Sequence, residues 1–171
     1  WEAVQLEMQR RKDYMERYGI GQLDFVNVED NPFRGRVICG CCGSPFGRKT
    51  WNSTDEDLKR RVWQCNRKYE EKGKVKCKNK HIDEEILYEA FVNGFNDMVD
   101  NREELVKKWG AEDGDALAKY RAKEFIELTK EKIDEFDVDL FFRVVEKMMV
   151  FEGGKVVVRF MYGTGRGCVL E

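Results

Sequence analysis

Five of the six cysteines fall between residues 39 and 77, and four of these have a spacing that suits a metal ion. Cys39 and Cys42 form a Cys-x-x-Cys turn whose glycines allow backbone amides to fold over the sulfurs. Cys65 and Cys77 are farther apart, so a loop must bring Cys77 back to the others. Four thiolates from separate turns are the ligands of a structural tetrahedral Zn²⁺. The sequence therefore predicts a Zn²⁺ site formed by these four cysteines.

The other candidate ligands are weaker. Cys41 lies between two predicted ligands and is expected to be an idle thiol, and Cys168 has no visible partner in the sequence. His81, the only histidine, could replace a cysteine, but its expected role is at the start of the next helix. Disulfides are the alternative for the cysteines as a group. The Cys-Gly-x-Cys-Gly pattern and the crowding of its sulfurs favour metal in a reducing cytosol.

Charge is segregated along the chain. Residues 34–80 contain 14 Lys/Arg against 5 Asp/Glu, a local charge of +9 in a chain whose net charge is −2. Residues 1–33 carry −3 and residues 81–171 carry −8. Four thiolates with one Zn²⁺ would lower the charge of the middle segment only to about +7. A metal-bound basic segment inside an acidic chain indicates contact with nucleic acid.

Arginines of this basic segment are the main candidates for DNA contact, because the planar guanidinium pairs with phosphates and guanine edges. The predicted DNA-binding residues are Arg34, Arg36, Arg48, Lys49, Arg60, Arg61, Arg67 and Lys68. The lysines at 72, 74, 76, 78 and 80 are expected only to attract phosphates, without reading sequence. The alternative for all of these side chains is an ordinary solvated surface.

Around the cysteines, the sequence alternates as β-strands do. Strands are predicted at Phe33–Cys39, Pro45–Trp51 and Val62–Cys65. A helix with one apolar face is predicted before them, over Trp1–Tyr18, with Gly19 as its stop signal. The predicted zinc site thus lies where these strands meet.

Helical spacing dominates after Cys77. One helix is predicted from Ile82 to Val99, and a shorter one begins at Asn101 and breaks at Gly110–Gly114. A third helix is predicted from apolar residues three and four positions apart, namely Ala118, Ala122, Phe125, Thr129, Ile133 and Phe136. Asp137 is the expected N-cap of a last helix through Met148. Gly153-Gly154 then predicts a hairpin between two β-rich runs.

These elements predict an α+β fold, with a zinc β-ribbon, a helical subdomain and a C-terminal β-hairpin. The expected division is a linker helix at 1–20, a zinc β-ribbon at 33–80, a helical subdomain at 81–150, a β-hairpin at 149–163 and a tail at 164–171. A chain of 171 residues can form one ordinary domain or two small ones. No membrane span or signal peptide is visible, and the expected location is the cytoplasm.

The ribbon motif resembles that of a known family. VWQCNR at residues 62–67, preceded by CGCCG at 39–43 and followed by Cys77 and IDE at 82–84, resembles the zinc β-ribbon of large serine recombinases. LAKYR at 117–121, EFD at 135–137 and the run at 145–150 before Gly-Gly are similar to the downstream part of the same proteins. The resemblance covers most of residues 33–163, and the ribbon motif is its most specific part.

This resemblance implies site-specific DNA integration or excision by phage and mobile-element enzymes. In that family an N-terminal domain supplies the serine nucleophile, and a middle domain and the zinc ribbon bind attachment-site DNA. A helical insertion near the ribbon mediates contacts between subunits. The implied partners are therefore double-stranded DNA and other recombinase subunits, with no membrane.

The chain starts at Trp1 within a helical pattern and lacks a nucleophile domain. We therefore expect a piece of a longer recombinase that has no catalytic residues and does not cut DNA itself. The region corresponding to the insertion, Asn101–Phe136, is too short for a long coiled-coil arm. A catalytic zinc is not expected either, because it usually has three protein ligands and an open position for water. The main alternative is a zinc-ribbon interaction module that docks onto other proteins through its helices.

Overall fold

The computed structural model describes residues 1–21, 30–110, 116–161 and 165–168. Its helices are α1 (Glu2–Tyr18), α2 (Glu84–Asp100), α3 (Arg102–Gly110), α4 (Ala116–Leu128) and α5 (Val138–Val144). Its strands are β1 (Val37–Cys39), β2 (Phe46–Trp51), β3 (Arg60–Cys65), β4 (Ile82–Asp83), β5 (Val145–Val150), β6 (Val156–Phe160) and β7 (Gly165–Cys168).

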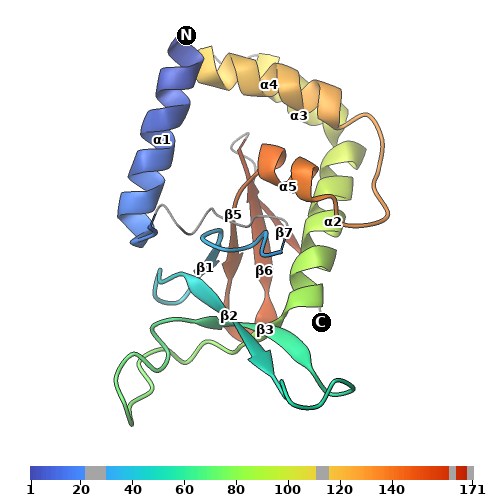
Figure 1. The fold of residues 1–171 in the computed structure, drawn as a ribbon. Helices are drawn as coiled ribbons and strands as arrows, with labels where there is room; N and C mark the ends of the chain where they lie inside the picture. Colours follow the sequence, from blue (N-terminus) through green and yellow to red (C-terminus); the bar gives the residue numbers. More distant parts are fainter. Residues whose placement is uncertain (22–29, 111–115, 162–164, 169–171) are drawn as a thin grey trace.

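These strands form two sheets, which lie one above the other in Figure 1. The upper sheet has the order β1-β5-β6-β7, in which β1 is parallel to β5 and the other pairs are antiparallel. The lower sheet has the order β2-β3-β4 and is antiparallel throughout. The α+β class predicted from the sequence is confirmed.

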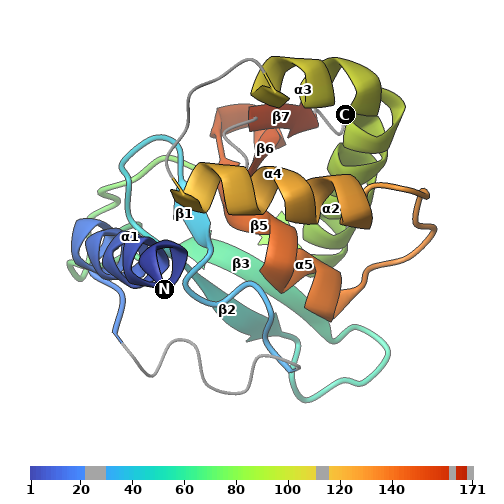
Figure 2. The same ribbon diagram turned by 90° about the horizontal axis from the view of Figure 1, so that it is seen from above.

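Helices surround the upper sheet on three sides. Figure 1 shows α1 along one edge, α4 across the top and α2 along the opposite edge, and Figure 2 shows the same frame from above. Helix α2 packs against β6 and β7, whereas α1 meets α4. Because α2 follows β4 directly, it also joins the lower sheet to this frame.

Aromatic side chains connect the lower sheet to helices α2 and α5. Phe33 is fully buried, and its ring lies 6.0 Å from the Trp63 ring of β3 and 5.2 Å from the Phe141 ring of α5, both edge-on. Phe91 of α2 contacts Phe141 at 5.3 Å. Edge-to-face contacts add to the large apolar area that aromatic rings bury. The lower sheet therefore shares one core with the helices.

The first predicted strand is shorter than expected. Residues 32–36 form a turn, with the Arg36 amide donating to the Phe33 carbonyl at 3.0 Å, and only Val37–Cys39 is strand. This strand pairs with β5 of the upper sheet, while β4 at Ile82–Asp83 completes the lower sheet. The segment predicted as the ribbon, 33–80, therefore contributes β1 to the upper sheet. The lower sheet in turn includes β4, which lies just beyond residue 80.

Several helix predictions are confirmed. Helix α1 ends where expected, with Gly19 in the left-handed conformation at φ 62°, and Asp137 caps α5 by accepting the Leu140 amide. The predicted α4 seam is wrong beyond Leu128, because Thr129, Ile133 and Phe136 lie in the connection to α5. The break predicted at Gly110–Gly114 falls largely outside the described residues.

The largest correction concerns the end of the chain. The helix predicted from Asp137 through Met148 stops at Val144, and residues from Val145 onward form β5. β-branched residues and pairing with a strand more than 100 positions earlier outweigh the local helical spacing. The predicted hairpin forms between β5 and β6, around a 3₁₀ turn at Glu152–Gly154. The expected tail at 164–171 is wrong for Gly165–Cys168, which pair with β6 as β7.

Candidate metal centre and nucleic-acid interface

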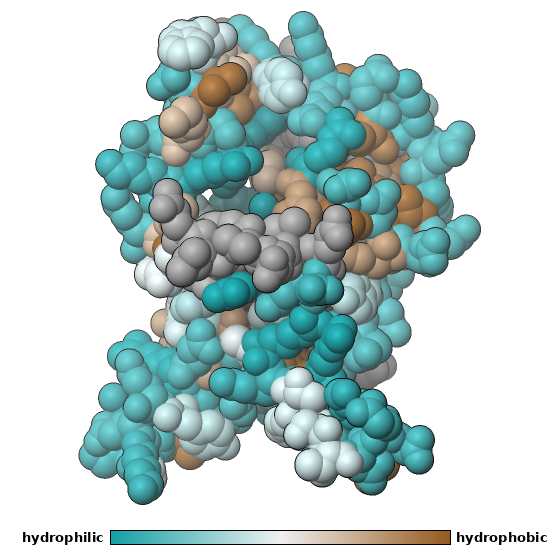
Figure 3. Space-filling model, in the orientation of Figure 1, coloured by the Kyte–Doolittle hydropathy of each residue, from teal (hydrophilic) through white to brown (hydrophobic). Residues whose placement is uncertain are grey.

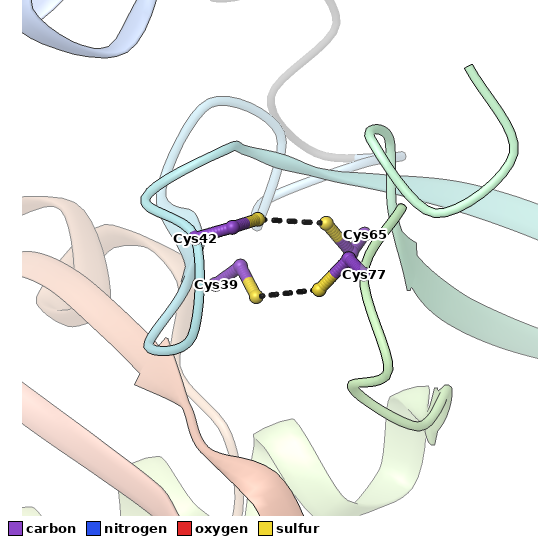
Figure 4. A group of neighbouring side chains, drawn as sticks. All are labelled: Cys39, Cys42, Cys65 and Cys77. Carbon is purple, nitrogen blue, oxygen red and sulfur yellow. Dashed lines mark hydrogen bonds between the residues drawn. The ribbon is translucent and has the colours of Figure 1, made fainter. Parts of the chain in front are cut away.

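The four predicted ligands converge at the junction of the two sheets (Figure 4). Cys39 ends β1, Cys42 lies in the turn that follows, Cys65 ends β3 and Cys77 comes from the loop before β4. Their Sγ atoms all lie within 4.8 Å of one another. The Sγ atoms of Cys39 and Cys77 are 3.6 Å apart, and those of Cys42 and Cys65 are 3.4 Å apart.

These separations suit a metal ion. Four sulfurs about 2.3 Å from a tetrahedral Zn²⁺ lie about 3.8 Å from each other. A disulfide requires about 2.05 Å, so neither close pair is one. Three of the four cysteines are buried and Cys42 is half-buried, so little of the group is exposed to solvent. The donor set is therefore one that can hold a metal ion with no open position.

The chain folds locally to aim hydrogen-bond donors at Cys39. The turn closes through the Gly43 amide, which donates to the Cys39 carbonyl at 2.9 Å, and Gly43 takes a positive φ of 73°. Burial raises the pKa of Cys39, but hydrogen bonds from the Asn79 amide and from the backbone amides of Cys41 and Cys42 outweigh this and lower it to about 7. Burial raises the pKa of Cys65 well above its usual range. A bound cation would favour deprotonation of such a thiol.

Two weaker candidate ligands lie outside the sulfur group. Cys41 is exposed, although it lies between Cys39 and Cys42 in the chain. The ring of His81 contacts the Trp51 ring of β2 at a tilt of 54°, with 4.3 Å between centroids, so it lies against the lower sheet. Among the residues that the structure describes, the group consists of the four cysteines of the predicted set.

Comparison with known families identifies the lower sheet. Residues 32–96 match the family model of the recombinase zinc beta ribbon domain. The matched range contains all four cysteines and all three strands of the lower sheet. The chain carries a recombinase zinc ribbon. We use "ribbon" below for residues 32–83, which include this sheet and its loops.

A solved structure extends the likeness beyond the ribbon. A chain in a crystal structure of a large serine recombinase–DNA complex superimposes with a TM-score of 0.53 and 15% sequence identity, over 90% of this chain. At this identity the match shows a shared fold. The present chain spans 62% of the length of that chain. A search of curated proteins gives no match. The resemblance to the C-terminal zinc-ribbon region of large serine recombinases is confirmed.

The predicted DNA-binding residues fall into two groups in the structure. Arg48 belongs to the first, in which the side chain is held by the protein itself. Its Nη2 donates to Glu84 Oε1 at 2.7 Å, and its side chain is only 17% exposed. Glu84 is 2% exposed and also accepts from Trp63 Nε1 at 2.8 Å. Arg48 thus compensates a buried carboxylate at the start of α2.

Arg36 and Lys68 are held in a similar way. Arg36 donates from Nη1 to the Val145 carbonyl at 2.7 Å, and its guanidinium lies 4.9 Å from the centre of the Phe142 ring. Burial lowers the pKa of Arg36 to about 10. Lys68 Nζ donates to the Asn79 carbonyl at 2.8 Å and so holds the loop that carries Cys77. We call Arg36, Arg48 and Lys68 the anchoring set.

The second group faces solvent. Its members are Arg34, Lys49, Arg60, Arg61 and Arg67, which we call the exposed set. Cross-strand register places Lys49 and Arg60 on one face of the ribbon and Arg61 on the other, where it approaches Glu84 at 3.6 Å. Arg60 also lies 5.1 Å from the centre of the Trp51 ring. Basic side chains therefore point outward from both faces.

Two loops of the ribbon extend from the base of the molecule. One joins β2 to β3, and the other joins β3 to β4 and contains the exposed lysines at 72, 74, 76, 78 and 80. Figure 3 shows both as separate, mostly hydrophilic projections. Among the described residues, no helix is both long enough and apolar enough to cross a bilayer.

Sequence reasoning did not identify two residues of the site. Glu84 lies in the first turn of α2, where an acidic residue is favoured on local grounds alone, and only the fold brings Arg48 and Trp63 to it. Asn79 lies among alternating lysines and carries no motif, yet its Nδ2 lies 3.3 Å from Cys39 Sγ. Only its proximity to Cys77 could have drawn attention to it.

Proposed function

We propose that this chain is the DNA-binding region of a large serine recombinase, and that its ribbon contacts attachment-site duplex DNA. The observation that carries the proposal is the local charge of +9 over residues 34–80, much of it on side chains that face solvent. Residues 81–171, most of which lie outside the ribbon, carry −8. Such a distribution orients the ribbon toward a polyanion and the rest of the chain away from it.

We propose that Cys39, Cys42, Cys65 and Cys77 bind Zn²⁺. Four sulfurs with little exposure, at separations close to those of a tetrahedron, favour Zn²⁺ over a harder cation. The ion would join the ends of β1 and β3 to the loop before β4. It therefore fixes the positions from which the exposed set reaches DNA.

The exposed set is the proposed contact surface, whereas the anchoring set holds the fold. Guanidinium groups of Arg60, Arg61 and Arg67 are suited to phosphates and to guanine edges. Lysines of the β3–β4 loop would add phosphate attraction that is independent of sequence. The similarity to a chain from a large serine recombinase–DNA complex supports this assignment.

In this proposal the serine nucleophile and strand exchange belong to another domain of the parent recombinase. Site-specific integration or excision in a mobile element is the reaction that this region would serve. Other recombinase subunits are the expected protein partners. The cytoplasm, where such DNA is accessible, is the proposed location.

Salt titration of duplex binding tests the proposal. In the triple variant Lys49→Gln, Arg60→Gln and Arg67→Gln, the binding constant K should fall less steeply with salt. The magnitude of the slope of log K against log salt should decrease by about 0.9 per lost contact, or by up to about 2.7 in all. The matched control neutralises Lys119, Lys123 and Lys155, which are exposed outside the ribbon, and should leave the slope unchanged. Equal effects of the two triples, or binding that ignores salt, would overturn the proposal and favour docking onto protein.

A further inference from the structure

Asn79 is a buried polar residue beside the sulfur group. Only 1% of it is exposed, and it lies two positions after Cys77. Its Nδ2 lies 3.3 Å from Cys39 Sγ and donates to the Val150 carbonyl at 2.7 Å. One amide group therefore contacts both a predicted ligand and the last residue of β5.

The orientation of this amide is fixed by its neighbours. Both groups facing Nδ2 are acceptors, a sulfur and a carbonyl oxygen, so the NH₂ can satisfy both. Rotation of the amide would place Oδ1 against the same two acceptors. Among the described residues Oδ1 is buried and has no hydrogen-bond partner, so the two bonds donated by Nδ2 are what favour this orientation.

The Val150 carbonyl also binds the cysteine turn directly. The Gly40 amide donates to it at 2.8 Å, so this one oxygen accepts from both Gly40 and Asn79. The Phe151 ring packs against Gly40 so closely that a Cβ at residue 40 would overlap it. Val150 and Phe151 lie outside the range 32–96 of the ribbon family model. The end of β5 therefore contacts both the cysteine turn, at Gly40, and Asn79.

We propose that Asn79 is a positioning residue of the metal centre, which holds the Cys39 thiolate and connects it to strand β5. A donated N–H stabilises a negative sulfur and fixes its direction, as hydrogen bonds around metal ligands generally do. The inference rests on the proposed binding of Zn²⁺ by the four cysteines. Its consequence is that the C-terminal hairpin takes part in metal binding, although it supplies no ligand.

The test compares Asn79→Ala and Asn79→Asp in the whole chain. Zn²⁺ affinity, measured by competition with a chelator, should fall about 10- to 100-fold in Asn79→Ala. The Zn²⁺ affinity of Asn79→Asp should be lower still, because its carboxylate would face a thiolate and a carbonyl oxygen. Asn66→Ala is the matched control, because Asn66 is exposed beside Cys65, and it should bind Zn²⁺ as the wild type does.

A spectroscopic measurement separates positioning from a purely structural role. In the Co²⁺-loaded protein, loss of the Asn79 hydrogen bond raises the energy of the sulfur lone pairs. The thiolate-to-cobalt charge-transfer band should then move to longer wavelength in Asn79→Ala but not in Asn66→Ala. If Asn79→Ala does not fold, Asn79→Leu, which fills a similar space but cannot donate a hydrogen bond, takes its place in both measurements.

Three outcomes would overturn the inference. One is wild-type Zn²⁺ affinity in Asn79→Ala, and another is an Asn79→Asp protein that binds Zn²⁺ better than Asn79→Ala, since a side chain that only fills space is best replaced by its isostere. Failure of the wild type to bind Zn²⁺ would remove the metal assignment together with this inference. None of these readouts involves DNA, so they leave the proposed DNA contacts to be judged by the salt titration.

Discussion

At the scale of single residues, chemistry carried by local spacing was predictable and chemistry that depends on burial was not. The Cys39–Cys42 turn is local, and few cysteines were available to complete the set, so the sulfur group follows from the sequence. Arg36 and Arg48 look like any other arginines in the sequence. Only packing against Phe142 and Glu84 gives them their structural roles.

Single Cys→Ser variants test the ligand assignment. Cys77→Ser should lose its Zn²⁺, because a tetrahedral site with three remaining thiolates is left open to water and chelators. Cys41→Ser should keep about one Zn²⁺ per chain, because this exposed thiol lies outside the sulfur group. Metal analysis of the purified variants measures both. A Cys41→Ser protein without Zn²⁺, beside a Cys39→Ser protein that retains it, would contradict the assignment.

Replacement of Arg48 tests the distinction between the anchoring and exposed sets. Arg48→Ala leaves Glu84 buried without its closest cation and should lower the free energy of unfolding by roughly 3 kcal/mol. Arg60→Ala removes a half-exposed side chain that lies 3.7 Å from Asp83, and should cost about 0–1 kcal/mol. Urea denaturation of the two variants makes the comparison. Equal losses of stability would show that Arg48 does not anchor the fold.

At the scale of elements, the accuracy of the predicted boundaries depended on how far apart in the chain the interacting residues are. Gly19, Asp137 and Gly153-Gly154 gave correct boundaries because caps and tight turns depend on neighbouring residues. The parallel pairing of β1 with β5 joins residues more than 100 positions apart, and no local pattern indicates it. Because of this pairing, residues from Val145 onward form strand β5, although the sequence predicted a helix through Met148.

Phe125 tests the part of the α4 seam that is confirmed. It is fully buried in α4, so Phe125→Ala should lower the free energy of unfolding by roughly 3–5 kcal/mol through lost burial and the cavity left behind. Tyr120→Ala removes a side chain of the same helix that is 57% exposed, and should change stability by about 0.5 kcal/mol or less. Chemical denaturation compares the two. A small effect of Phe125→Ala would mean that α4 does not pack as described.

At the scale of the whole molecule, the first helix meets elements from the second half of the chain. Glu7 of α1 accepts from Arg10 at 2.9 Å and from Arg121 of α4, and Lys147 of β5 donates to Tyr18 of α1 at 2.6 Å. The sequence suggested a linker helix, and nothing local in it indicated these contacts. These charged and polar contacts hold α1 against α4 and β5 (Figure 1), and α1 itself contains no buried residue.

This polar attachment predicts a specific acid sensitivity. Burial raises the pKa of Glu7, but hydrogen bonds from Arg10 and Arg11 and the charge of Arg121 outweigh it and lower the pKa to about 2. A carboxylate whose pKa is depressed in the folded state stabilises the fold above its unfolded pKa, near 4.5, and loses this contribution as pH falls toward 2. The difference in unfolding free energy between the wild type and Glu7→Gln should therefore be full at pH 6 and shrink steadily below pH 4.5.

Urea denaturation of both proteins between pH 6 and pH 2.5 measures this difference. Glu2→Gln is the matched control, because Glu2 is exposed on the same helix, and its difference from the wild type should stay small throughout the range. Because Arg121 belongs to α4, part of this difference comes from the contact between α1 and α4. A difference between wild type and Glu7→Gln that stays constant with pH would show that Glu7 does not carry this attachment.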